Sequence, residues 1–195
     1  MYGSSLNSSY YTIMQPFGLI YSCASQATFI IEQIPNVSFP DLQQKEAYLG
    51  EAYFWRGFCH FFLLTNYRNV SLITKAPVDA SDYVRPVSDP EDVWNSICSD
   101  FAMAETLLPN KGYWKGDKAG RVTAASAAAM LGKSYLYRSG IEPLYGHSQT
   151  TYYNEAAAAF DRIIRGDYGT FRLVEYSHNF DVAHENNDES ILELQ

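Results

Sequence analysis

The segment from about Gln43 to Asn66 constrains the fold more than any other, because its apolar residues recur at the period of an α-helix. The residues that follow this period, or widen the apolar face beside it, are Leu49, Ala52, Trp55, Phe58, Cys59, Phe61, Phe62 and Leu64. A helix with so wide an apolar face needs other helices on two sides to bury it. The segment therefore predicts a helical protein with this helix in its interior.

Apolar periodicity and end signals predict four further helices, at about residues 11–34, 90–108, 124–139 and 152–165. Ser88 and Glu91 have the spacing of a capping box, and Pro90 suits an early position in a helix. Thr123 is expected to cap the alanine-rich helix that follows it, and Gly140 is expected to end that helix. Helices account for most of the chain, so the expected fold class is all-α.

The connections between these helices are long, and two short segments are expected to be extended. Asn69 is suited to a left-handed turn at the end of the second helix, and residues 70–74 are predicted to be extended after it. The carboxyl-terminal tail is expected to be mixed in structure, with a short strand at Ser190–Leu194.

Composition excludes several classes of protein. The 195 residues suffice for one domain, or for one domain and part of another, and the 47% hydrophobic content excludes a wholly disordered chain. A formal net charge of −8 argues against nucleic acid as a partner, since phosphates require a basic surface. The longest run of large apolar side chains in a predicted helix, Phe61–Leu64, is too short to span a membrane. Residues 1–5 have neither the basic nor the apolar region of a signal peptide.

The sequence offers no recognisable catalytic or metal-binding pattern. Cys23, Cys59 and Cys98 lack CxxC spacing and are interpreted as small buried thiols, with a disulfide framework or a metal site as the alternative. His60 lies in the aromatic helix and is expected to be packed or hydrogen-bonded there. The histidines lack the i, i+4 spacing of a helical zinc pair, and the GxSxG, phosphate-loop and dinucleotide motifs are absent. No enzyme activity, metal or cofactor is therefore expected.

Two pairs of helices carry the spacing of a tetratricopeptide repeat. Leu131, Gly132 and Tyr135 match the first helix of such a repeat, and Ala156 and Phe160 match the second. In this motif the glycine lets the neighbouring helix approach closely.

An earlier copy of the repeat is weaker. Gly57 stands where Gly132 does, and Ile97, Phe101 and Ala104 have the second-helix spacing. The prediction is therefore two tetratricopeptide-like helical hairpins with long loops, preceded by one unpaired helix.

Three ordered blocks resemble the SusD/RagB family. They are GEAYFWRGFCHFFLL at 50–64, GRVTA at 120–124 with LGKSYLY at 131–137, and NNDESILELQ at 186–195. The first resembles the family's Glu-Ala-x-Phe-x-Arg-Ala helix, which a Tyr-Gly-Asp-Val-Pro-Leu turn follows. Here Arg68-Asn69 replaces the Gly-Asp of that turn, and Ser71 replaces its proline.

The resemblance implies a SusD-like α-α superhelix. Residues 1–195 would be its amino-terminal helical-repeat domain, incomplete at both ends, without the leader and the lipid-anchoring cysteine. It further implies a non-catalytic lipoprotein exposed on the outer membrane, which captures oligosaccharides for a SusC-like, TonB-dependent outer-membrane transporter. Two alternatives remain at this point: a tetratricopeptide-like adaptor that binds a protein segment, and a hydrolase whose catalytic part is missing.

Sugar binding calls for aromatic rings beside polar side chains, because sugars present apolar ring faces and hydroxyl rims. The candidate ligand-binding residues are Tyr67, Asn69, Tyr83, Tyr113 and Trp114. Packing within the fold is the alternative role for each of these tyrosines and for the tryptophan. For Tyr113 and Trp114 this alternative is packing of their loop against a helix end.

Overall fold

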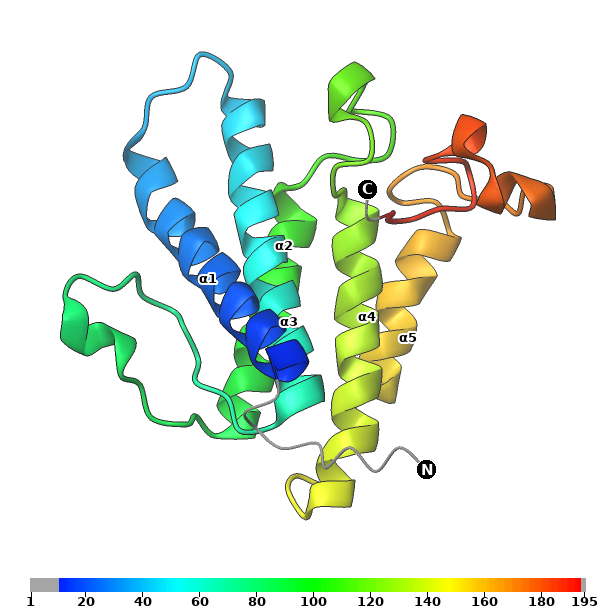
Figure 1. Cartoon of the computed structure of the whole chain (residues 1–195). Coiled ribbons are helices and arrows are strands. Elements are labelled where there is room, and N and C mark those ends of the chain that lie inside the picture. The colour runs from blue at the N-terminus through cyan, green and yellow to red at the C-terminus, as the bar shows by residue number, and fades with distance from the viewer. Residues whose placement is uncertain (1–10, 194–195) are drawn as a thin grey trace.

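The computed structural model of the chain describes residues 11–193, with side chains from residue 15 onward except that of Tyr83 (Figure 1). Within this range the main elements are α1 Tyr11–Gln33, α2 Leu42–Tyr67, α3 Pro90–Leu107, α4 Ala124–Ile141 and α5 Tyr153–Ile164. Short 3₁₀ helices lie between and after them: η1 Ile34–Asn36, η2 Ala80–Tyr83, η3 Gly116–Lys118, η4 Glu142–Tyr145, η5 Tyr176–Phe180 and η6 Val182–His184. The described part of the chain contains no β-strand, so the all-α prediction is confirmed.

Each main helix packs against the next one along the chain, so the helices form a layered series from α1 to α5 (Figure 1). Helix α2 lies between α1 and α3, as its wide apolar face predicted. Phe54 of α2 and Trp94 and Phe101 of α3 are fully buried at the centre of the core. The two predicted hairpins, α2–α3 and α4–α5, are therefore both present.

Two glycines allow these hairpins to close. A Cβ atom on Gly132 of α4 would lie 2.7 Å from the ring of Phe160 on α5, too close for an ordinary contact. A Cβ atom on Gly57 of α2 would lie 3.1 Å from the Cβ of Asp100 on α3 and 3.4 Å from the Phe101 ring. Glycine therefore has the same role in both copies of the repeat, as the spacing predicted.

Two predicted helix ends were wrong. Asp89, not Ser88, caps α3, because its carboxylate accepts from the Glu91 backbone N–H at 2.8 Å. The Ser88 hydroxyl instead accepts from the Leu72 N–H at 2.9 Å. Gly140 lies inside α4, which continues to Ile141.

Two predictions outside the helices were also wrong. Residues 190–193 form no strand, and the Ile191 carbonyl accepts from the Ser126 hydroxyl of α4 at 2.9 Å. Leu194 lies outside the described residues. The residue with a positive φ after α2 is Arg68, with φ 62° and ψ −60°, and not Asn69.

Arg68 adopts a backbone conformation that favours glycine, and tertiary contacts hold it there. Its guanidinium pairs with the buried carboxylate of Glu142 at 2.7 and 3.1 Å and lies over the Tyr145 ring at 4.1 Å. The indole N–H of Trp94 donates to the same carboxylate at 2.5 Å. The end of α2 is thereby fixed to α3 and to the end of α4.

A buried ion pair joins α2 to α3. The Arg56 guanidinium donates to both carboxylate oxygens of Asp100, at 2.8 and 2.6 Å, and Asp100 is only 2% exposed. Removing one partner would leave the other charge buried without compensation.

We predict that Asp100→Ala lowers the free energy of unfolding by about 3–5 kcal/mol, measured by urea denaturation at neutral pH. Asp167→Ala is the matched control, since it removes an exposed pair with Arg165 and should change stability by less than about 1 kcal/mol. Equal effects of the two substitutions would contradict a structural role for the buried pair.

Candidate ligand-binding cleft

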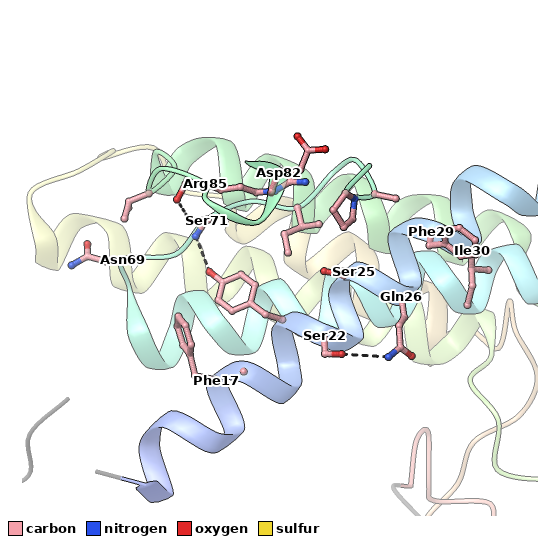
Figure 2. Close-up of a pocket in the computed structure, with 16 residues that line it drawn as sticks. Phe17, Ser22, Ser25, Gln26, Phe29, Ile30, Asn69, Ser71, Asp82 and Arg85 are labelled. Atoms are coloured by element: carbon pink, nitrogen blue, oxygen red, sulfur yellow. Dashed lines mark hydrogen bonds between the residues drawn. The ribbon is translucent and has the colours of Figure 1, made fainter. Parts of the chain in front are cut away.

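An open cleft of about 1050 Å³ lies between α1 and the connection from α2 to α3 (Figure 2). Its apolar lining consists of Phe17, Tyr21, Phe29, Ile30, Ile73, Ala76, Pro77 and Val87, and its polar lining of Ser22, Ser25, Gln26, Asn69, Ser71, Asp82 and Arg85. Helix α1 supplies one wall, and residues 69–87 supply the other. Figure 2 shows the lining residues of α1 and of the facing connection on the two sides of the cleft.

The α1 wall carries aromatic rings at both ends, Phe17 and Tyr21 at one and Phe29 at the other. Phe17 makes edge contacts with Tyr21, at 4.8 Å between ring centroids, and with Tyr67 of α2, at 5.0 Å. Residues four apart lie on one face of a helix, which is why Phe17 and Tyr21 meet. Phe29 and Ile30 remain 56% and 41% exposed. An exposed aromatic ring on a cleft wall is available to a ligand.

Hydrogen bonds from α1 hold the opposite wall in place. The Tyr21 hydroxyl accepts from the Ser71 backbone N–H at 2.7 Å. The Thr28 hydroxyl shares its proton between the Ala24 carbonyl of α1, at 2.9 Å, and the Ile73 carbonyl of the opposite wall, at 3.3 Å. Burial raises the pKa of Tyr21, so its hydroxyl stays protonated at physiological pH. Ser71 Oγ donates in turn to the Arg85 carbonyl at 3.2 Å (Figure 2). The two walls are therefore linked through Tyr21 and Ser71.

Two polar side chains on the connection are fixed by local bonds. The Arg85 guanidinium donates to the carbonyls of Asp82, at 2.8 Å, and Lys75, at 2.9 Å. The Asp82 carboxylate accepts from the Val78 N–H at 2.8 Å. Both charged groups therefore reach the cleft from a loop that they also brace.

His60 of α2 holds this loop through a hydrogen bond to its backbone. Its Nε2 accepts from the Ile73 N–H at 3.1 Å, so the ring proton lies on Nδ1, which faces the Arg56 carbonyl at 3.0 Å. Burial, with the nearby Arg56 charge, lowers the pKa of His60 to about 4. The expected hydrogen-bonded role of this histidine is confirmed, and the neutral ring ties the cleft floor to α2.

The structure divides the sequence-predicted site residues between two places. Asn69 lines the cleft, and Tyr67 lies behind it in contact with Phe17. The side chain of Tyr83 lies outside the described residues, although its neighbours Asp82 and Arg85 line the cleft.

Tyr113 and Trp114 do not line the cleft, and lie in the connection from α3 to α4. Trp114 is only 8% exposed, its indole N–H donates to the Val122 carbonyl at 3.0 Å, and its ring stacks on Tyr48. These contacts correspond to the packing alternative considered for this loop.

Sequence reasoning missed the α1 wall. Phe29 and Ile30 fall outside the buried stripe of α1, and this exposed apolar pair on a helix was the signal available in the sequence.

Residues 11–193 contain no group of three or more side chains suited to hold a metal ion, and none of the described helices is long and apolar enough to cross a membrane. In the tail the rings of His178 and His184 stack with their centroids 3.8 Å apart, and His184 is hydrogen-bonded to the Asp181 carboxylate.

A sequence profile of the SusD-like family, described as "Starch-binding associating with outer membrane", matches residues 1–136. The chain belongs to the SusD-like family. The resemblance that its sequence blocks indicated is thereby confirmed.

Two SusD-like relatives align with this chain over different lengths. A SusD-like protein of Bacteroides ovatus is 27% identical over 177 residues, which is 90% of this chain and 31% of that protein. SusD-like protein P38 of Formosa agariphila is 37% identical over 89 residues, 45% of this chain and 17% of that protein. The chain thus spans less than a third of the length of these two relatives.

Solved structures share the fold. A SusD superfamily protein from Bacteroides vulgatus matches with a TM-score of 0.77 at 28% identity, over 96% of this chain and 37% of that one. A structure described as a laminarin-binding SusD-like protein matches with a TM-score of 0.73 at 28% identity, over 95% of this chain and 37% of that one. The layered helices are therefore a SusD-like arrangement.

We predict that His60 makes the stability of this SusD-like chain fall on acidification. Its pKa is about 4 in the folded state and about 6.5 when unfolded, so the unfolded state binds more protons between these values. Lowering the pH from 7 to 4 should therefore remove roughly 3 kcal/mol of stability through this group.

Urea denaturation of the wild type and of His60→Gln over this pH range tests the prediction. The variant should show a shallower pH dependence, whereas His147→Gln, at an exposed histidine, should keep the wild-type slope. An unchanged slope in His60→Gln would refute the assignment.

Proposed function

We propose that this chain is the helical-repeat part of a non-catalytic, cell-surface glycan-capture protein that delivers oligosaccharides to a TonB-dependent outer-membrane transporter. Residues 1–195 would form its amino-terminal domain, and the full-length protein would be lipid-anchored in the outer membrane. The family description and the laminarin-binding relative support this class. The single observation that carries the ligand chemistry is the cleft, which combines exposed apolar and aromatic groups with fixed polar ones.

The cleft meets both requirements of a sugar. Phe29 offers an exposed ring face for the C–H groups of a pyranose. Asn69, Asp82 and Arg85 offer amide, carboxylate and guanidinium groups for hydroxyls. The volume of about 1050 Å³ is at the upper end for small-molecule sites, which suits an oligosaccharide.

This part of the protein should bind glycans weakly by itself. The cleft is open and has few ring platforms, so a dissociation constant of about 1 mM is expected, equivalent to about 4 kcal/mol. Of the candidates from sequence, we retain Asn69 in direct contact and Tyr67 as support for Phe17. Tyr83 stays a candidate, because the loop that carries it borders the cleft. We assign Tyr113 and Trp114 to loop packing.

We predict that Phe29→Ala weakens glycan binding about three- to tenfold, since it removes one stacking ring. Affinity electrophoresis in gels containing laminarin or starch measures this effect. Phe180→Ala is the matched control, because Phe180 is also an exposed phenylalanine, 74% against 56% for Phe29, and lies in the tail outside the cleft. It should migrate like the wild type.

Asn69→Ala should also weaken retention, through the loss of one polar contact in the cleft. Equal retention of wild type, Phe29→Ala and Asn69→Ala would place the glycan site elsewhere. Absence of retention by any polysaccharide, together with capture of an extended peptide by the wild type, would favour the adaptor alternative.

A further inference from the structure

Helices α1 and α2 run antiparallel, and their register brings two cysteines opposite each other. Phe17 of α1 contacts Tyr67 of α2. From this contact, six residues along α1 lead to Cys23, and eight residues back along α2 lead to Cys59. At 1.5 Å per residue these steps span about 9 and 12 Å, so both cysteines lie at a similar height in the helix pair.

The two cysteines face each other across the helix pair. Cys23 shares a crevice with Trp55 of α2, and Cys59 lies four residues further along α2, on the same side of that helix. The ionisation of each thiol accordingly depends on the other. Small residues surround them, with Ala24 and Ala27 buried on α1 and Ala52 buried on α2. Small side chains allow two helix backbones to come close, and a disulfide requires Cα atoms within about 4.4–6.8 Å.

The two thiols differ in accessibility. Cys59 is buried, with 4% of its surface exposed, whereas Cys23 is exposed. Cys23 also lines a crevice of about 420 Å³ between the helices, together with Ala52 and Trp55. A small reagent can therefore react directly with Cys23. The buried Cys59 can react only with a group that is already attached to Cys23.

The surroundings activate one thiol and protect the others. The neighbouring Cys59 thiol lowers the pKa of Cys23 despite partial burial, which favours the reactive thiolate form at Cys23. The presence of Cys23, together with burial, raises the pKa of Cys59. Burial raises the pKa of Cys98, near Arg138 on another face of the fold, to about 11. Cys23 is thus the expected attacking thiol.

We infer that Cys23 and Cys59 are a redox pair that forms a reversible disulfide between α1 and α2 when the protein meets a small-molecule disulfide. The Cys23 thiolate attacks one sulfur of the oxidant and releases the other as a thiol, which leaves a mixed disulfide on Cys23. Cys59 then loses its proton, attacks the Cys23 sulfur and displaces the second thiol. Two protein thiols are oxidised, and the oxidant is reduced to two thiols.

The disulfide would fix the wall of the candidate cleft. Gln26 and Ile30 of α1 line both the cleft and the crevice beside Cys23. A covalent bond at Cys23 would therefore hold α1 on α2 at the level where ligand groups gather. The inference itself does not rest on the proposed function, because it concerns only the chemistry of the two thiols.

The test is oxidation of the folded wild-type protein with oxidised glutathione at pH 7.5, followed by denaturation, alkylation with N-ethylmaleimide and mass spectrometry. The number of alkylated cysteines should fall from three to one, and a peptide pair joining Cys23 to Cys59 should appear. Dithiothreitol should restore all three. Three alkylated cysteines after oxidation, a disulfide involving Cys98, or a glutathione adduct that persists on Cys23 of the wild type would overturn the inference.

Three variants assign the steps. Cys59→Ala should accumulate the mixed disulfide on Cys23, because the resolving thiol is missing. Cys23→Ser, at an exposed position that tolerates a polar side chain, should form neither adduct nor disulfide. Cys98→Ser should form the disulfide at the wild-type rate. Disulfide formation in Cys23→Ser would contradict the pairing even if Cys59→Ala failed to fold.

Discussion

Helix α2 is buried between α1 and α3, so the polar side chains on its covered surface must find partners inside the protein. Three of them do so in three directions. Arg56 pairs with Asp100 on α3, Glu51 pairs with Arg121 in the connection from α3 to α4, and His60 accepts from Ile73 at the cleft floor. The central helix thereby positions α3 and both long loops. The location of the cleft follows from this arrangement, because one of its walls is a loop that α2 holds.

The sequence predicted the helical part of this architecture closely. Periodicity placed all five main helices to within about two residues, since each one buries a continuous apolar stripe. The repeat spacing also predicted the close approaches at Gly57 and Gly132. Those contacts depend on residues a fixed number of positions apart within a hairpin, and such spacing is visible in the sequence.

Contacts between residues far apart in the sequence account for what the sequence did not predict. Ser88 has a suitable capping side chain, but the Leu72 N–H engages it, and Asp89 caps α3 instead. Trp114 lies in a polar, glycine-containing loop, a sequence context that favours an exposed ring. In the structure its ring is buried, bonded to the Val122 carbonyl and stacked on Tyr48. The cleft itself joins α1 to a segment about 50 residues later, and no local pattern encodes that meeting.

The position of α1 at one end of the layered series has an energetic consequence. Among the main helices α1 packs chiefly against α2, so it forms one end layer of the series and has a single main-helix interface to lose on detaching. A glycan that contacts both Phe29 and the facing loop would bridge this layer to the body of the protein. Glycan binding would then stabilise the packing of α1 on α2. By the same linkage, a protein whose α1 is already packed on α2 would bind the glycan more tightly.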